Sequence, residues 1–238
     1  MIQLVKNSNY EFSSIRLLTS LKTLPNKTPG IICDIGCRDG RFAKLLEQRF
    51  PSIDKIILID ISASNIHRAR SLCRRTPERF EYIIADARYL PLRDAHVDTC
   101  VLLEVIEHLI PLEGSRVLKE VNRIIRDSGL ILFSTPNKNS ITSITGRILF
   151  PFLGLKWTTG DQSHAHIYSM NEILGLLKKE GFRILQKRGF YILPAGLHEI
   201  DKKLGNNKLY GIALSKMVFR SRRRFKKEAC RSYREKEW

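Results

Sequence analysis

The stretch from Ile31 to Gly40 constrains the fold more than any other part of this 238-residue chain. It reads Ile-Ile-Cys-Asp-Ile-Gly-Cys-Arg-Asp-Gly, so a short apolar run breaks into a turn that contains two glycines. The residues that follow, 41–50, have the apolar spacing of a helix. In a strand, turn and helix of this kind, backbone N–H groups can approach a ligand, because glycine has no side chain to block it. The sequence therefore predicts a nucleotide-cofactor loop.

The positions of the small residues indicate which cofactor the loop binds. Dinucleotide enzymes have glycine at the first, third and sixth positions of the turn, and two of these positions here are Arg38 and Arg41. The observed order instead resembles motif I of class I S-adenosylmethionine-dependent methyltransferases, in the residues Asp34, Gly36, Cys37 and Gly40. Arg38 stands where that family usually has its middle glycine. Its side chain either turns outward or lies near the methionine carboxylate of the cofactor.

Two further strand ends resemble the same family. The apolar run 55–60 ends in an acid roughly twenty residues beyond the glycine turn, where a carboxylate can accept both ribose hydroxyls. The next strand, 80–85, is followed by Asp-Ala, at the position where the family recognises adenine. The resemblance thus implies a ribose site at Asp60 and Ile61 and an adenine site at Asp86 and Ala87.

Two later segments resemble the small-molecule branch that includes ubiquinone-pathway O-methyltransferases. The first contains Leu-Pro, Val-Asp and, after an apolar strand over 99–103, Glu-x-x-Glu-His at residues 104–108. The second, 128–137, is a fifth strand that ends in Thr-Pro-Asn. The resemblance places Leu103 and Glu104 at the edge of the methionine pocket.

Apolar strands alternate with amphipathic helical segments along the chain, the latter at 41–50, 62–75, 112–126 and 169–179. This alternation predicts an α/β fold, a Rossmann-like, doubly wound, mostly parallel sheet with helices on both faces. Residues 182–188 supply the sixth strand and 212–219 the antiparallel seventh. We expect one methyltransferase domain over 1–219, with a lid insertion at about 138–163, and a basic tail over 220–238.

The expected lid is rich in Ile, Leu, Phe and Trp between residues 141 and 157. Loops after the carboxyl ends of parallel strands form the ligand sites of such sheets, so an apolar insertion there suits an apolar or lipid-linked acceptor, with Trp157 as a substrate contact. Two alternatives are a helix packed on the core and a segment that lies on a membrane surface.

Histidines supply the candidate bases. His164 and His166 precede a segment that resembles the His-x-x-Phe-Ser of the family, and we expect one of them to face the acceptor, with His164 as a substrate contact. A histidine can take a proton from a hydroxyl during methyl transfer. The predicted catalytic residues are His166 and the competing base His108. The combination of Glu104, Glu107 and His108 with a later histidine also resembles sites in some relatives that hold a divalent metal, where Glu104 and His108 share one helical face. The alternative is that Glu104 only edges the methionine pocket and that Glu107 and His108 cap or pack.

The net charge of +17 is concentrated near the end of the sequence, where residues 201–238 hold thirteen Lys or Arg against four Asp or Glu. Clustered cations with aromatic interruptions suit RNA or an anionic membrane surface. A solvated basic terminus is the alternative. The five cysteines form no paired zinc spacing and no disulfide framework, and no apolar stretch approaches a bilayer span. These features predict a cytoplasmic protein, with peripheral membrane contact as a variant.

Together these patterns predict S-adenosylmethionine-dependent transfer of a methyl group to an oxygen of a small-molecule or lipid-linked acceptor. RNA methylation is the alternative within the same chemistry, favoured by the basic charge. A non-catalytic protein that keeps the fold and uses the tail is a second alternative, supported by Arg38. A nicotinamide oxidoreductase is disfavoured by the arginines in the glycine turn.

Overall fold

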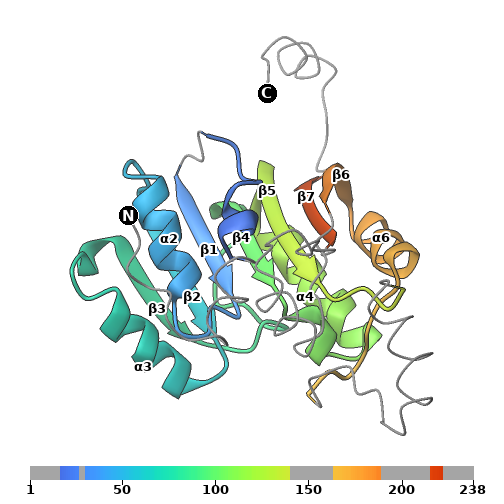
Figure 1. The fold of residues 1–238 in the computed structure, drawn as a ribbon, viewed down its shortest axis with the longest axis horizontal. Coiled ribbons are helices and arrows are strands. Elements are labelled where there is room, and N and C mark those ends of the chain that lie inside the picture. Colours follow the sequence, from blue (N-terminus) through green and yellow to red (C-terminus); the bar gives the residue numbers. More distant parts are fainter. Residues whose placement is uncertain (1–16, 27–29, 140–162, 189–214, 222–238) are drawn as a thin grey trace, which may run out of the picture.

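The protein forms one mixed sheet of seven strands in the order β3-β2-β1-β4-β5-β7-β6 (Figure 1). The computed structural model describes residues 17–26, 30–139, 163–188 and 215–221. The strands are β1 (Ile31–Ile35), β2 (Lys55–Asp60), β3 (Phe80–Ile84), β4 (Val97–Leu103), β5 (Ile125–Thr135), β6 (Phe182–Arg188) and β7 (Ser215–Ser221). The first five pair in parallel, and β7 pairs antiparallel with both β5 and β6.

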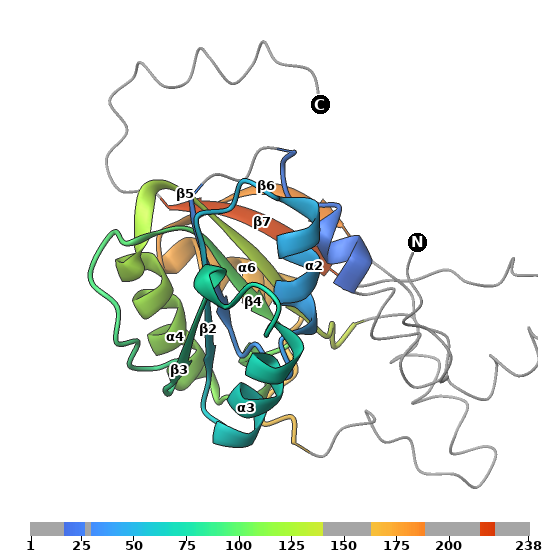
Figure 2. The same ribbon diagram turned by 90° about the vertical axis from the view of Figure 1, so that its left-hand side faces the viewer.

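Helices cover both faces of the sheet (Figure 2). One buried cluster joins the sheet to α2 (Arg41–Arg49) and α3 (Ala63–Leu72), and the other joins it to α4 (Pro111–Ile124) and α6 (Met170–Lys179). Neighbouring residues of β1 pack into different clusters: Ile32 lies in the cluster on the α2 side, and Cys33 lies in the cluster on the α4 side. Burial on both faces explains why the parallel strands read as continuous apolar runs.

The strand order reverses next to β1, which lies between β2 and β4. Connections from neighbouring strands therefore leave in opposite directions at the carboxyl edge of the sheet, and such a switch point is where open α/β sheets bind ligands. The predicted cofactor residues all lie at or just beyond the carboxyl ends of β1 to β4. The fold thus gathers motifs that are up to 70 positions apart in the sequence, from Asp34 to Glu104, along one edge.

The predicted mostly parallel α/β class is confirmed, and the differences are local. The helix predicted over 112–126 ends at Ile124, and Ile125 is already the first residue of β5. Residues 104–108, expected to share a helical face, instead contain only the short 3-10 helix η2 (Ile106–His108). The antiparallel strand predicted over 212–219 is β7, which continues to Ser221.

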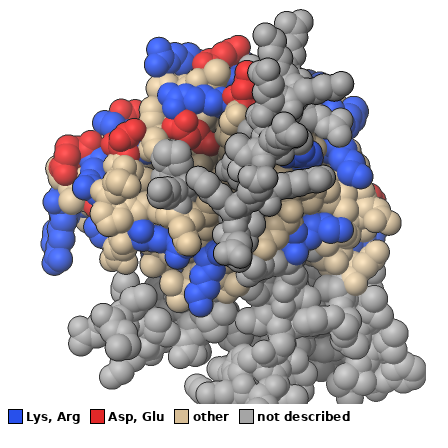
Figure 3. Space-filling view, turned by 90° about the horizontal axis from the view of Figure 1, so that it is seen from above, with Lys and Arg blue, Asp and Glu red and all other residues tan. Residues whose placement is uncertain are grey.

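Some sequence predictions lie outside the described residues. These are most of the lid, including Trp157, and the basic tail beyond Ser221. On the face shown in Figure 3, some Lys and Arg side chains of the described part lie beside acidic side chains, and others are surrounded by uncharged residues. None of the described helices combines the length and the apolar character that crossing a membrane requires. The four described cysteines, Cys33, Cys37, Cys73 and Cys100, are free and buried.

Candidate functional site

The loop after β1 is built around Gly36. Its backbone has φ of 71°, and the amides of Gly36 and Cys37 both donate to the carbonyl of Ile59, at 2.8 and 3.1 Å. A Cβ on Gly36 would lie 2.4 Å from Cγ2 of Val105, so glycine is needed here both for the left-handed conformation and for close packing. This contact also brings the loop against the segment that follows β4.

Arg38 shares this left-handed conformation, with φ of 53°. The conformation explains why the family prefers glycine at this position, since a side chain there costs energy. Its amide donates to Oδ2 of Asp60 at 2.9 Å, and the residue is exposed. Which of the two expected orientations its side chain takes beside a bound cofactor stays a prediction.

Asp34, at the centre of the motif, is 3% exposed, and its Oδ2 atom is buried without a hydrogen-bond partner among the described residues. Burial, together with the nearby charge of Asp60, raises the pKa of the Asp34 carboxyl to about 7. A buried carboxylate of this kind is stabilised by a cationic group. Burial likewise raises the pKa of the Cys37 thiol, which acts here as a small neutral side chain.

Asp60 ends β2 and organises the loops around it. Its Oδ2 accepts from the Arg38 amide, and its Oδ1 accepts from the Ser62 amide at 2.9 Å and from Nδ2 of Asn65 at 3.0 Å. The carboxylate therefore joins the β1 loop to the start of α3. The next residue, Ile61, is 70% exposed, which leaves an apolar surface beside the predicted ribose site.

Asp86 follows β3 and forms an ion pair with Arg88, in which the guanidinium Nη2 lies 2.6 Å from Oδ2. These hydrogen bonds hold the pKa of Asp86 below its ordinary value. Arg88 also pairs with Glu113 at the start of α4. Sequence reasoning missed this arginine, although its place two residues after the predicted adenine acid was a usable signal.

Glu104 follows Leu103 at the end of β4 and has φ of 55°. Its Oε1 accepts from the Ser134 hydroxyl at 2.6 Å, and its amide donates to the Ser134 carbonyl at 3.0 Å. The expectation that Glu104 and His108 share a helical face is therefore wrong, because the left-handed residue turns the chain before η2 begins. Glu104 is joined to the end of β5 instead.

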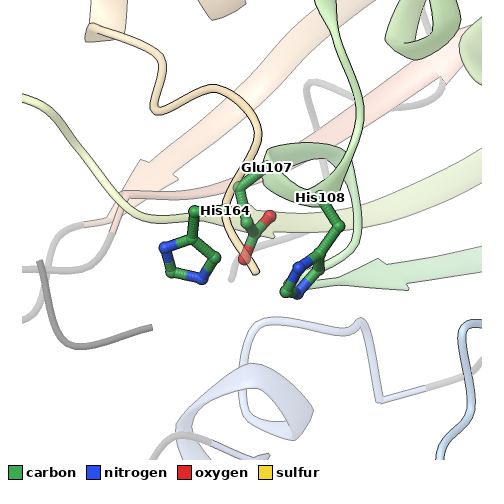
Figure 4. Close-up of side chains that lie close together, drawn as sticks. All are labelled: Glu107, His108 and His164. Atoms are coloured by element: carbon green, nitrogen blue, oxygen red, sulfur yellow. The ribbon is translucent and has the colours of Figure 1, made fainter. Parts of the chain in front are cut away.

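A second group of side chains gathers around η2. Ligand atoms of Glu107, His108 and His164 all lie within 4.8 Å of one another, and Figure 4 shows the three side chains turned toward a common space. The His166 amide donates to the Glu107 carbonyl at 3.0 Å and thereby joins the segment before α6 to η2. The His166 ring packs edge-on against Tyr168, with ring centroids 4.5 Å apart.

Comparison with known protein families gives a match over most of the chain. The pattern of a family described as methyltransferase domain matches residues 7–187. The chain belongs to the methyltransferase-domain family. The predicted membership of class I S-adenosylmethionine-dependent methyltransferases is thereby confirmed, and S-adenosylmethionine is the cofactor of this family. The narrower ubiquinone-pathway branch stays a prediction.

Three similar proteins illustrate the relationship. A probable S-adenosylmethionine-dependent methyltransferase of Mycobacterium tuberculosis is 29% identical over 77% of this chain and 59% of its own length. The malonyl-[acyl-carrier protein] O-methyltransferase of Geobacter sulfurreducens is 28% identical over 66% of this chain and 57% of its own length. The chain thus spans less than two thirds of these relatives. The crystal structure of the PH0226 protein from Pyrococcus horikoshii shares the fold, with a TM-score of 0.64, 22% identity and coverage of 90% and 92%.

The residues at the carboxyl edge fit this cofactor. The buried Asp34 oxygen without a hydrogen-bond partner suits a ligand that carries an ammonium group, and the tightly packed Gly36 keeps the loop backbone free of side chain. Asp60 and Asp86 supply acceptors for hydroxyl and amino groups. The three acids lie at or just beyond the carboxyl ends of β1, β2 and β3, which are neighbours in the sheet.

Proposed function

We propose that this chain transfers the methyl group of S-adenosylmethionine to an oxygen atom of a small-molecule or lipid-linked acceptor. The observation that carries the proposal is that the glycine loop and the histidine group are neighbours. Gly36 packs against Val105, and η2 begins at the next residue, Ile106. Groups able to bind the cofactor and groups able to take a proton therefore adjoin within one site.

On the cofactor side, Asp34 would hold the ammonium group and Asp60 the ribose hydroxyls. Asp86 would accept from the adenine amino group, with the Ala87 amide beside it and Ile61 as an apolar wall. Leu103 and Glu104 would edge the methionine part, where Glu104 is fixed by Ser134. The bound cofactor supplies a methyl group on a sulfonium, which is a good leaving group. The protein has mainly to position the two reactants and exclude water.

On the acceptor side, His166 is the base that we propose. It lies on the segment before α6, tied to η2 through the Glu107 carbonyl. Its imidazole would accept the proton of a hydroxyl acceptor, while the bound cofactor would supply the methyl group. His108 remains the competing base. The O-methyltransferase named among the relatives supports oxygen as the methylated atom.

The apolar lid and the basic tail belong to this proposal as substrate-side features. The lid residues, Trp157 among them, would cover an apolar acceptor, with His164 at its inner end. The tail would bring the site to an anionic surface, because clustered Lys and Arg bind acidic headgroups.

The first test is calorimetric titration of the purified chain with S-adenosylmethionine and S-adenosylhomocysteine. Both ligands should bind, and Asp60→Ala should weaken them at least tenfold, because it removes the ribose acceptor and the loop contacts. Asp54→Ala is a matched control, since this exposed acid lies just before the opposite end of β2. Equal affinity of the two variants would contradict the proposed cofactor site.

The second test uses cofactor labelled in the methyl group and a panel of acceptors. Carboxylate thioesters, hydroxylated quinone precursors and transfer RNA are each incubated with the full chain. Labelled ester or ether from the first two groups supports the proposal. Label found only in RNA would replace it with the RNA alternative.

A further inference from the structure

The strongest unassigned feature is the group formed by Glu107, His108 and His164. It combines one carboxylate with two imidazoles, contributed by η2 and by the segment that precedes α6. The three side chains converge in Figure 4, and no two of their ligand atoms are more than 4.8 Å apart. Glu107 and His108, which are adjacent in the chain, thus lie beside His164, which is 56 positions after His108.

We propose that these three residues bind a divalent transition metal ion. Two histidines and one carboxylate are the ligand set of open-sided Fe(II) centres, and imidazole also suits Zn²⁺, Co²⁺ and Ni²⁺. Ligand atoms about 2.0–2.2 Å from a metal lie closer together than 4.8 Å, so the side chains must draw together slightly. Because His108 is exposed and His164 is half-buried, such an adjustment disturbs little packing.

The surrounding hydrogen bonds support this assignment. Nδ1 of His108 lies 3.2 Å from the Ser163 carbonyl oxygen and 3.0 Å from its hydroxyl. If Nδ1–H donates to the carbonyl, the lone pair of the ring is on Nε2, and metal-binding histidines are oriented by contacts of this kind. Oε2 of Glu107 accepts from the Thr135 hydroxyl at 3.1 Å, which fixes the carboxylate in the same way.

Burial gives an energetic reason for the ion. The Glu107 side chain is 0% exposed, and a buried carboxylate is costly unless hydrogen bonds or a cation stabilise its charge. Thr135 provides one hydrogen bond. A divalent ion held between the carboxylate and two imidazoles would supply the opposite charge.

The location also suggests a role, which rests on the methyl transfer proposed above. Three protein ligands leave coordination positions open, so an acceptor hydroxyl or carboxylate can bind the ion directly. A bound metal lowers the pKa of a hydroxyl ligand and fixes its direction of attack. His108 would then be a ligand, which leaves His166 as the base.

Metal binding is tested on the full chain, stripped with a chelator and then titrated with Co²⁺, whose visible absorption reports coordination by nitrogen and oxygen. Calorimetry with Zn²⁺ and Mn²⁺ gives affinity and stoichiometry. We expect one ion per chain and at least a tenfold loss of affinity in His164→Ala and Glu107→Gln. His67→Ala, which removes an exposed histidine of α3, should bind as the unmodified chain does. Circular dichroism confirms that each variant is folded.

The absence of stoichiometric binding, or equal affinity in His164→Ala and His67→Ala, overturns the proposal. Titration of the metal-free chain with S-adenosylhomocysteine separates this result from the proposed function. If the cofactor binds while no metal does, only the metal site fails. If metal binds and the cofactor does not, the methyltransferase proposal fails and the metal site stands.

Discussion

The loop after β1 and the group around η2 lie side by side but are built differently. The loop is held by contacts among residues that close the ends of two neighbouring strands, such as the Arg38 amide on Asp60, 22 positions away. The η2 group depends on residues that are far apart in sequence, such as His108 and Ser163, 55 positions away. One side is therefore fixed by a compact motif, whereas the other exists only once the segment before α6 has docked. We expect the two sides to respond differently to substitution.

The largest effect is expected from His166→Asn, which removes the proposed base and leaves the loop intact. Loss of a general base typically lowers kcat by about 10²–10⁴-fold. Affinity for S-adenosylhomocysteine should change less than about twofold, because His166 has no contact with the loop in our assignment. Single-turnover kinetics and calorimetry measure the two quantities. A parallel loss of affinity and rate would show that the two sides are not separable.

Gly36→Ala should abolish cofactor binding, whereas the histidine substitution should lower the rate and leave binding intact. The new Cβ would lie 2.4 Å from Cγ2 of Val105, and the alanine would have to adopt a φ of 71°. Strain and overpacking together should lower the free energy of unfolding by about 2–4 kcal/mol. Denaturant titration checks this value, with Gly175→Ala as the matched control, since nothing lies within 4 Å of a Cβ there. Equal stability of the two variants would refute the assigned packing.

Asp34 should make both the free energy of unfolding and cofactor binding depend on pH. Its pKa is about 7 in the folded protein against an ordinary 3.8, so the folded state holds a proton that the unfolded state has lost between these values. The free energy of unfolding should therefore fall as pH rises through this window, and the destabilisation is complete above about pH 7.

An ammonium group bound beside Asp34 favours the ionised carboxylate, so S-adenosylhomocysteine, which carries such a group, should bind more tightly as pH rises toward neutrality. The slope should approach about tenfold per pH unit well below the pKa. Titrations between about pH 5.5 and 7.0 stay below the range in which the α-amino group of the ligand loses its proton. Asp34→Asn should remove the slope, and a slope that persists in this variant would assign it to another group.

The smallest effect is expected from Arg38→Gly, which relieves the left-handed conformation. The strain costs about 1–2 kcal/mol, and the greater freedom of glycine in the unfolded chain offsets part of it. A net gain of about 0.5–1 kcal/mol corresponds to a rise in Tm of about 1–3 °C for a chain of this size. Arg38→Ala removes the charge but keeps the strain, so it should show no rise. A similar rise in both variants would trace the effect to charge.

The contrast between the two sides also explains which features of the structure can be predicted from the sequence. The strand over 55–60 has the bounds expected from its apolar run, because a buried parallel strand carries a strong local signal. The antiparallel edge strand over 182–188 also has the expected bounds. The sequence locates Asp60 and Asp86 as well, because the first ends β2 and the second follows β3. Their roles as ligands of the cofactor remain predictions.

Contacts between distant segments carry no such signal. The left-handed conformation of Glu104, which separates it from His108, is set by its two hydrogen bonds to Ser134 on another strand. The partners Ser134 and Thr135 belong to a motif that the sequence reveals, but their contacts depend on how β4 and β5 align. The ion pair between Arg88 and Glu113 joins a loop to a helix in the same way. The packing of distant segments, rather than local sequence preference, determines the conformation and the contacts of these residues.

The end of β5 has a consequence for how the two substrates would influence each other. Ser134 holds Glu104 on the cofactor side, and its neighbour Thr135 holds Glu107 beside the histidines. A ligand that draws one glutamate inward would therefore pull on the residue next to the one that holds the other glutamate. Thermodynamic reciprocity then requires that the first ligand to bind alter the affinity for the second by the same factor in either order. Two adjacent hydroxyl groups would thus make this strand end the coupling element between donor and acceptor.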